Sequence, residues 1–198
     1  MKNLSIWLIA SISIIILSAG CGNSAKNDSK ARAINENNTR DSGEKDYPNS
    51  RMEISGADAK FAVEAADGGR AEVELGKLAM EKATNASIKN FGAMMVKDHA
   101  KANAELKQLA ADKKITLPDS LGKDAQKLKK ELSAKSGSEF DEAYVKAMVD
   151  DHKNDIKTFE EAKNVAKYPE MTAFISKTLP ILKMHLNAIK KIQDQMKL

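Results

Sequence analysis

The chain is poor in the residues that stabilise or shape a protein by means other than an aliphatic core. Its 198 residues include one cysteine, so an internal disulfide framework is excluded. Aromatic residues make up only 5% of the chain, and the core must therefore be built mainly from Ala, Leu, Ile, Val and Met. Glycine and proline number only 10 and 4, a composition that favours helices.

The sequence also lacks the features of several functional classes. The net charge of +4 is mild and basic residues are interspersed with acidic ones, which argues against a nucleic-acid-binding surface. There is no nucleophile motif, no phosphate-binding glycine loop and no catalytic Ser or Cys arrangement. The sequence therefore gives no positive indication of an enzyme.

The N-terminal segment is predicted to be an export signal. The apolar run from Leu4 to Leu17 follows Lys2 and is shorter than the roughly 20 residues that a membrane-spanning helix needs. It ends in Leu-Ser-Ala-Gly-Cys at Cys21, which resembles a bacterial lipobox. The resemblance implies a lipoprotein signal peptide at residues 1–20, cleavage before Cys21 and lipidation of its thiol. The alternative is an ordinary secretory signal with an incidental cysteine.

Residues 21–56 are rich in Asn, Ser, Lys, Asp and Glu and contain almost no large apolar side chain. Such a segment cannot bury enough surface to offset the entropy of ordering, so it is interpreted as a disordered tether that begins at the lipidated cysteine. The predicted location is the bacterial cell envelope, on a membrane, facing the periplasm or the outer membrane. The only partner that this predicts is the membrane, through the lipid anchor.

Helical periodicity dominates the rest of the chain, residues 57–198. Four long amphipathic stretches joined by short turns predict an all-α four-helix bundle, with a short extra helix between the second and third. Ser138 and Asp141 form a weak capping-box pattern, and Pro180 is expected to kink the last helix or to start a new segment. The expected helices run from Asp58 to about Lys82, from after Asn85 to near Lys113, from Leu121 to Leu132, from about Glu139 to Val165, and from about Glu170 to the C-terminus.

The chain contains the pattern Met-Val-x-Asp-His twice, ending at His99 and His152. The third and last histidine, His185, lies in the final predicted helix, and Glu72 falls on the apolar stripe of the first. Each of the four long helices thus carries one of these residues near its middle. Three imidazoles and a carboxylate are a plausible ligand set for one zinc, iron, manganese or copper ion.

Two alternatives follow from the same pattern. Without a metal, Glu72 would pair with the histidines in a buried polar network that fixes the helix register. Met95 and Met148, each four residues before a histidine, would suit copper(I), although methionines on a helix stripe are usually core residues. Asp98 and Asp151 point about 100° away from the adjacent histidines. They are therefore expected to be outer-shell or surface groups.

Several segments together resemble the domain of unknown function 4142, a family of bacterial envelope proteins. The resemblance covers roughly Asp58 to Lys197, and it implies a ferritin-like helical bundle that is commonly exported and has no established activity. Val96 and Val149 stand where a di-iron ferritin motif has glutamate, so a di-iron centre is not expected. The family pattern highlights the residues Glu72, Asp98, His99, Asp151, His152 and His185. The segments that carry the resemblance are Asp58–Phe61, Ala71–Ala79, the two Met-Val-x-Asp-His motifs, Leu179–Leu182 and His185-Leu186.

Two functions are therefore predicted from the sequence. The first is a membrane-tethered envelope lipoprotein whose bundle binds a transition metal through Glu72, His99, His152 and His185, in storage, sensing or stress protection. The second is a non-catalytic structural or interaction module of the envelope whose buried His/Glu network holds no metal.

Overall fold

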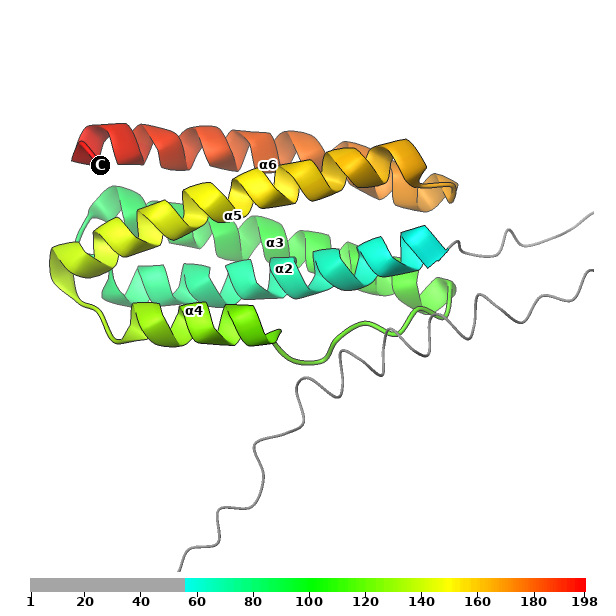
Figure 1. Ribbon diagram of the computed structural model, residues 1–198, viewed down its shortest axis with the longest axis horizontal. Coiled ribbons are helices and arrows are strands. Elements are labelled where there is room, and N and C mark those ends of the chain that lie inside the picture. The colour runs from blue at the N-terminus through cyan, green and yellow to red at the C-terminus, as the bar shows by residue number, and fades with distance from the viewer. Residues whose placement is uncertain (1–55) are drawn as a thin grey trace, which may run out of the picture.

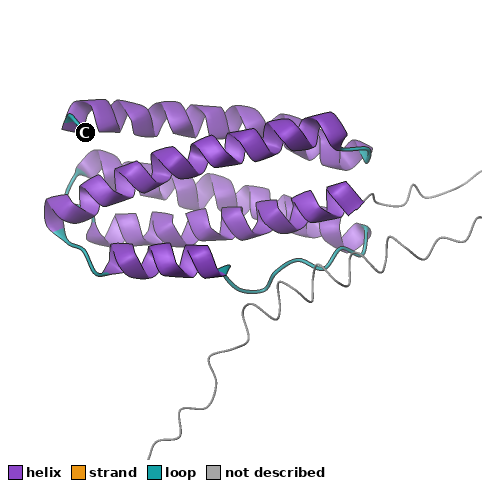
Figure 2. Cartoon of the chain, in the orientation of Figure 1, coloured by secondary structure: helices purple, strands orange, loops and turns teal. Residues whose placement is uncertain are grey.

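The computed structural model describes residues 56–198, and the predicted signal peptide, Cys21 and the rest of the predicted tether up to residue 55 lie outside them. Gly56, predicted as part of the tether, is instead the first residue of a helix. The described residues form helices and no strand (Figure 2). This confirms the predicted all-α bundle with a short extra helix between the second and third long helices. The helices are α2 (Gly56–Lys82), α3 (Ala86–Asp112), α4 (Lys123–Ser133), α5 (Gly137–Val165) and α6 (Pro169–Met196).

The four long helices form two antiparallel hairpins that pack against each other (Figure 1). The first hairpin is α2 and α3, and the second is α5 and α6. Between the hairpins, α2 contacts α5 and α3 contacts α6, so that every long helix has two long neighbours. The short α4 lies outside this arrangement, against α2 and α5. None of the described helices has both the length and the apolar character needed to cross a membrane.

The connection from α3 to α4 is held against α2 by two side chains. Arg70 donates to the carbonyl oxygens of Pro118, at 2.6 Å, and Asp119, at 3.1 Å. The carboxylate of Asp67 accepts from the backbone N–H of Gly122 at 2.7 Å, directly before α4 begins. Because these bonds come from one turn of α2, the crossover follows the bundle surface closely.

The helix boundaries agree with the sequence at most positions. Helix α3 begins directly after Asn85, as predicted, and the Asn85 side chain caps it by accepting from the N–H of Ser87 at 2.8 Å. Helix α6 continues as one helix through Pro180, so the predicted second segment does not form there. Pro180 is exposed on the outside of the bundle.

The predicted capping box at Ser138 is wrong. Helix α5 begins at Gly137, and Asp141 lies in its interior with only 3% of its surface exposed. Its carboxylate accepts instead from the backbone N–H groups of Thr84, at 3.1 Å, and Asn85, at 2.9 Å, and from the Thr84 hydroxyl. A residue that looked like a local cap therefore links α5 to the turn between α2 and α3.

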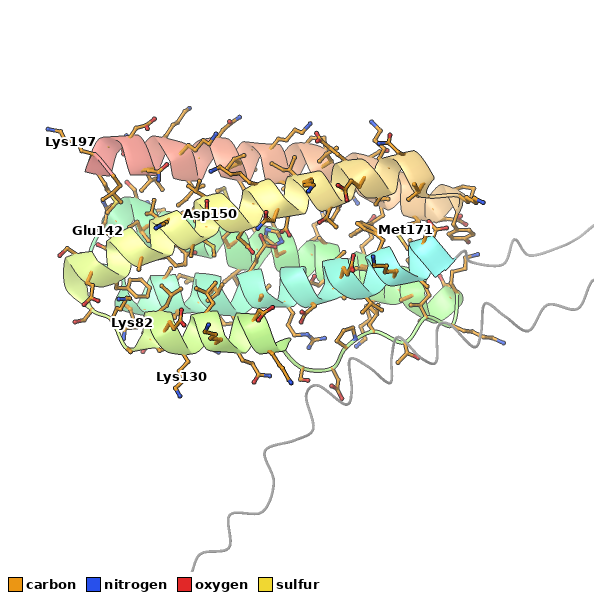
Figure 3. All side chains as sticks on the ribbon, in the orientation of Figure 1. Lys82, Lys130, Glu142, Asp150, Met171 and Lys197 are labelled. Atoms are coloured by element: carbon orange, nitrogen blue, oxygen red, sulfur yellow. The ribbon has the colours of Figure 1, made fainter. Side chains whose placement is uncertain are left out.

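The interior contains two separate hydrophobic clusters, one toward each end of the bundle. The first is centred on Phe61, Phe159 and Phe174, with the Phe61 and Phe159 rings edge-to-face at a centroid distance of 4.9 Å. The second surrounds Phe91 and Tyr144. Charged side chains cover the outside; Lys130 and Lys197, for example, project away from the bundle in Figure 3. The region between the two clusters is polar.

Candidate metal centre

A buried polar layer separates the two hydrophobic clusters. On every long helix, the polar residue lies in sequence between the residues of one cluster and those of the other. The layer consists of Glu72 on α2, His99 on α3, His152 on α5 and His185 on α6. Their exposed fractions are 1%, 5%, 0% and 0%, respectively. The four residues singled out from the sequence therefore meet inside the bundle.

Glu72 lies between His99 and His152. Its Oε2 is 2.7 Å from Nδ1 of His99, and its Oε1 is 3.4 Å from Nε2 of His152. The other ring nitrogen of His152, Nδ1, is 3.0 Å from the carbonyl oxygen of Met148 one helical turn earlier. A carbonyl only accepts, so Nδ1 of His152 carries the proton and Nε2 is left with a free lone pair.

His185 on α6 completes the layer. Its Nε2 is 3.0 Å from Oδ2 of Asp98, and its Nδ1 is 3.3 Å from Nε2 of His99. The Asp98 carboxylate accepts a hydrogen bond from Nε2–H, which leaves Nδ1 of His185 as a lone pair directed at His99. Asp98 is 25% exposed, so it connects the layer to the bundle surface.

Each imidazole therefore has one nitrogen paired with an outer oxygen atom and one nitrogen facing the other histidines. The outer oxygen belongs to Glu72 for His99, to Asp98 for His185 and to a backbone carbonyl for His152. One nitrogen from each ring lies within 4.8 Å of one from each other ring. Metal-bound histidines use this arrangement, because the outer acceptor fixes the tautomer and the orientation of the ring.

The spacing of the nitrogens fits a metal ion. Bonds of about 2.05 Å in a tetrahedral site place two ligand nitrogens roughly 3.3 Å apart. The Nε2 of His99 and Nδ1 of His185 are at 3.3 Å already. One nitrogen of His152 lies within 4.8 Å of a nitrogen on each of the other two rings, so it must move closer to them in a three-histidine site.

The electrostatics of the layer keep the imidazoles neutral. Burial lowers the pKa of His99 to about 4 and that of His152 to about 3, and it also lowers the pKa of His185. Metal ligation requires the neutral imidazole, and these rings are neutral at physiological pH without any further change. Phe91 lies against the layer, with its ring centroid 6.0 Å from that of His152 and 6.4 Å from that of His185.

Carboxyl groups gather on the α5 side of Glu72. Asp151 and Asp155 are half-buried, and Asp155 lines the same small cavity as Glu72. Burial raises the pKa of Glu72 and of Asp155 well above their ordinary values, with mutual repulsion among the acids as a further cause. Burial likewise raises the pKa of Asp151 to about 7. This side of the layer is short of positive charge.

A cavity of about 20 Å³ adjoins Glu72, His99 and Asp155. This volume holds roughly one water molecule. Two adjacent glycines of α2 line this cavity. A Cβ on Gly69 would stand 2.2 Å from Oδ1 of Asn103, which also lines the cavity, so the missing side chain of Gly69 is needed for this space. A Cβ on Gly68 would be 3.7 Å from Oδ1 of Asp155, which is an ordinary contact. A small ligand can therefore lie beside the histidine cluster.

The sequence anticipated part of this site. The sequence predicted a shared site for Glu72, His99, His152 and His185, and it predicted Asp98 and Asp151 as outer-shell or surface groups. In the structure, the Asp98 carboxylate contacts His185, and Asp151 lies beside Glu72 and His152. Asp155 was missed, although its position three residues after His152 places it on the same face of α5. Met95 and Met148 are fully buried in the second hydrophobic cluster.

The fold and the layer define a class of protein, a four-helix bundle with a buried histidine–carboxylate centre. The sequence pattern of the family described as Domain of unknown function (DUF4142) matches residues 44–192, and the chain belongs to this family. No curated protein sequence matches the chain.

Solved structures of CopM have a similar fold. The Cu(I)-bound form of CopM matches with a TM-score of 0.59 at 16% identity, covering 70% of this chain and 96% of CopM. The apo form matches with a TM-score of 0.58 at 15% identity, and the Ag-bound form obtained by co-crystallization with 0.58 at 16%, each over the same shares of the two chains. At this level of identity, the likeness establishes the fold.

Proposed function

We propose that this protein binds one transition-metal ion through the three histidines of the polar layer. The ligand atoms are Nε2 of His99, Nε2 of His152 and Nδ1 of His185. The observation that carries the proposal is the orientation of the rings: each has an oxygen partner on its outer nitrogen and directs the other nitrogen at the same point. Glu72 holds His99 in place, and it also remains a candidate ligand through Oε1.

The nature of the ligands narrows the choice of ion. Neutral imidazoles suit zinc, copper, iron and nickel better than they suit magnesium or calcium. Solved structures of a protein with this fold, CopM, contain Cu(I), Cu(II) or Ag. These structures support copper as a candidate beside zinc, iron and manganese.

The metal-free network indicates what the ion would replace. With a proton on Glu72, hydrogen bonds run without interruption from Glu72 to His99, from His99 to His185 and from His185 to Asp98. An ion needs the lone pair on Nε2 of His99, so His99 must take its proton on Nδ1 from Glu72 and release the other. Metal binding would therefore release about one proton, as expected for ligands that must be deprotonated.

The test is the metal content and thermal stability of the tag-free protein, before and after chelation. We expect one ion per chain and a lower melting temperature after chelation. An ion present at 100 times its dissociation constant adds about 2.7 kcal/mol to the free energy of unfolding. His185→Ala should abolish both effects, and Met184→Ala, which changes the adjacent exposed residue, should preserve them.

The second candidate function is a structural or interaction module without a metal. The uninterrupted hydrogen-bond chain from Glu72 to Asp98 favours it, because that chain is complete with protons alone. A wild-type protein that binds neither copper, zinc, iron nor manganese, and that melts at the same temperature with and without chelator, would support this candidate and refute the first.

The proposed location of either function is the bacterial cell envelope, with the domain anchored by lipid on Cys21. The support is the apolar run and the lipobox-like segment that ends at this residue. The expected result is that wild-type protein fractionates with membranes and carries lipid on Cys21 by mass spectrometry. Cys21→Ser should remove the lipid and release the protein; a Cys21→Ser protein that stays in the membrane fraction would contradict the proposal.

A further inference from the structure

Four buried polar atoms beside the histidine cluster make no hydrogen bond within the described residues. They are Oε1 of Glu72, Oδ2 of Asp151, Nε2 of His152 and the hydroxyl of Tyr144. One ligand atom from each of Glu72, Asp151 and His152 lies within 4.8 Å of the others. Buried polar atoms are almost always paired, so four of them at one place in a well-packed bundle need an explanation.

Tyr144 is the most informative of the four. Its side chain is fully buried in α5, among Phe91 and Phe140, yet its hydroxyl has no partner in that surrounding. The ring of Phe91 packs against both Tyr144 and His152, at centroid distances of 6.4 and 6.0 Å, which places Tyr144 beside the histidine cluster. Burial and the charges of Glu72 and Asp151 raise the pKa of its hydroxyl. An unpaired buried hydroxyl costs about 1–3 kcal/mol, and a group bound between it and the carboxylates would remove that cost.

We propose that this place is a second cation position, next to the three-histidine position and rich in oxygen ligands. The proposal rests on the proposed function, because it assumes that the histidines hold the first ion. Its ligands are the carboxylates of Glu72 and Asp151, with the Tyr144 hydroxyl as a third oxygen. A set of carboxylate and hydroxyl oxygens favours a harder divalent cation, such as manganese or iron(II), over copper.

Glu72 is the residue that lies between the two positions. Its Oε2 faces His99, and its Oε1 faces the second position. His152 borders both groups of ligands, but its Nδ1 is engaged by the Met148 carbonyl, so only Nε2 is free. One nitrogen serves one ion at a time. When both positions are filled, His152 belongs to the histidine position, and the second ion is held by oxygen atoms alone.

The geometry points to a pair of unlike ions rather than to two copies of one site. Paired ions in proteins commonly lie about 3.5–4 Å apart, a spacing that a carboxylate such as Glu72 can span. The histidine position offers three nitrogens, and the second offers two negative charges. Burial disfavours the charged form of both carboxyls and raises the pKa of each, and a divalent cation would compensate both charges.

The experiment uses the full tag-free chain, loaded first with one equivalent of Zn(II) and then titrated with Mn(II). Free Mn(II) is measured from its electron paramagnetic resonance signal. We expect one Mn(II) bound per chain, with affinity at least tenfold weaker in Asp151→Asn and also weaker in Tyr144→Phe. The matched control is Asp150→Asn, which removes the neighbouring exposed carboxylate on α5 and should leave Mn(II) affinity unchanged.

The outcomes separate this inference from the proposed function. If Zn(II) binds stoichiometrically and Mn(II) does not, the second position is refuted and the histidine site stands. If neither ion binds, both proposals fail. Mn(II) bound equally well by wild type, Asp151→Asn and Tyr144→Phe would refute the assignment of these ligands. Should Asp151→Asn fail to fold, as judged by circular dichroism, Tyr144→Phe decides the question, because it retains the ring that packs in the core.

Discussion

The buried carboxyls predict that the metal-free protein loses stability as the pH rises above 7. Burial raises the pKa of Glu72 and Asp155 well above their ordinary values and that of Asp151 to about 7. In the unfolded chain these groups ionise near pH 4, so above that pH the folded protein binds protons that the unfolded chain does not. The free energy of unfolding must then fall with rising pH until each folded-state pKa has been passed.

The histidines act in the opposite direction, but over a lower range of pH. The pKa of His99 is lowered to about 4 and that of His152 to about 3, and that of His185 is lowered too. Their contribution to stability therefore grows as the pH rises from these values and is complete once the unfolded chain has titrated near pH 6.5. Between about pH 4 and 6.5 the two groups oppose each other, and above pH 7 the carboxyls act alone.

The expected magnitude follows from the number of protons involved. Each proton bound only by the folded state lowers the free energy of unfolding by about 1.4 kcal/mol per pH unit. One protonated carboxyl between pH 7 and 8 therefore predicts a loss of about 1.4 kcal/mol, and two predict about 2.8 kcal/mol. Either value is a large part of the stability of a small domain.

The assay is urea unfolding of the protein at pH 7, 7.5 and 8 with a chelator present throughout. Glu72→Gln should reduce the slope with pH, because the amide does not titrate. Glu74→Gln on the same helix is the control. Hydrogen bonds from Lys129 and Lys77 lower the pKa of Glu74 to about 2, so Glu74 is ionised in the folded and the unfolded protein above pH 7. Its substitution should therefore leave the slope of the free energy of unfolding with pH unchanged in this range. A free energy of unfolding that is constant or rises from pH 7 to 8 would refute the reasoning.

Two further predictions concern the framework around the site, and urea unfolding checks both. Asp141→Ala leaves the donors of the turn at Thr84 without their acceptor and should cost about 2–3 kcal/mol, with no loss of metal binding; a cost below 0.5 kcal/mol would show that the link is unimportant. Gly76→Ala places a Cβ 2.7 Å from the carbonyl oxygen of Gly92 and should cost about 1–3 kcal/mol, whereas Gly68→Ala, with 3.7 Å of room, should be neutral or stabilising by about 0.5–1 kcal/mol. Equal effects of the two glycine substitutions would contradict the close crossing of α2 and α3.

The fold could be predicted because the relevant signals are local. Helical periodicity and the start of α3 after Asn85 depend on residues within one or two turns of each other. The errors arose where a local pattern met a distant partner. Asp141 looked like the partner of a capping residue at Ser138, but its carboxylate accepts from the backbone N–H groups of Thr84 and Asn85, which are more than fifty positions away in the sequence. A capping pattern cannot show that a more distant set of donors competes for the same carboxylate.

The centre of the site could be predicted for a related reason. A charged or titratable residue on an apolar stripe is conspicuous, and this selects Glu72 and the three histidines. Asp155 and Tyr144 were not selected, because a half-buried acid and a buried aromatic residue are ordinary on a bundle helix. Their relation to Glu72 depends on how α2 and α5 are rotated against each other, and this rotation is set by tertiary packing. Helical periodicity leaves it undetermined.

The energetic cost of burying the polar layer favours a bound ion over a purely structural role. Replacing a buried ionic or polar cluster by apolar side chains of similar size is often neutral or stabilising, so a layer that only held the helices together would be a costly way to do so. In this layer, Glu72, Asp151 and Tyr144 each also have a buried oxygen atom without a hydrogen-bond partner. The carboxyl groups of Glu72 and Asp151 lie close together although burial disfavours their charged forms. Protons complete one chain of hydrogen bonds but leave these atoms unsatisfied. Cations beside the histidines and between the carboxylates would satisfy both sets, which is why we regard metal binding as the function that the site supports best.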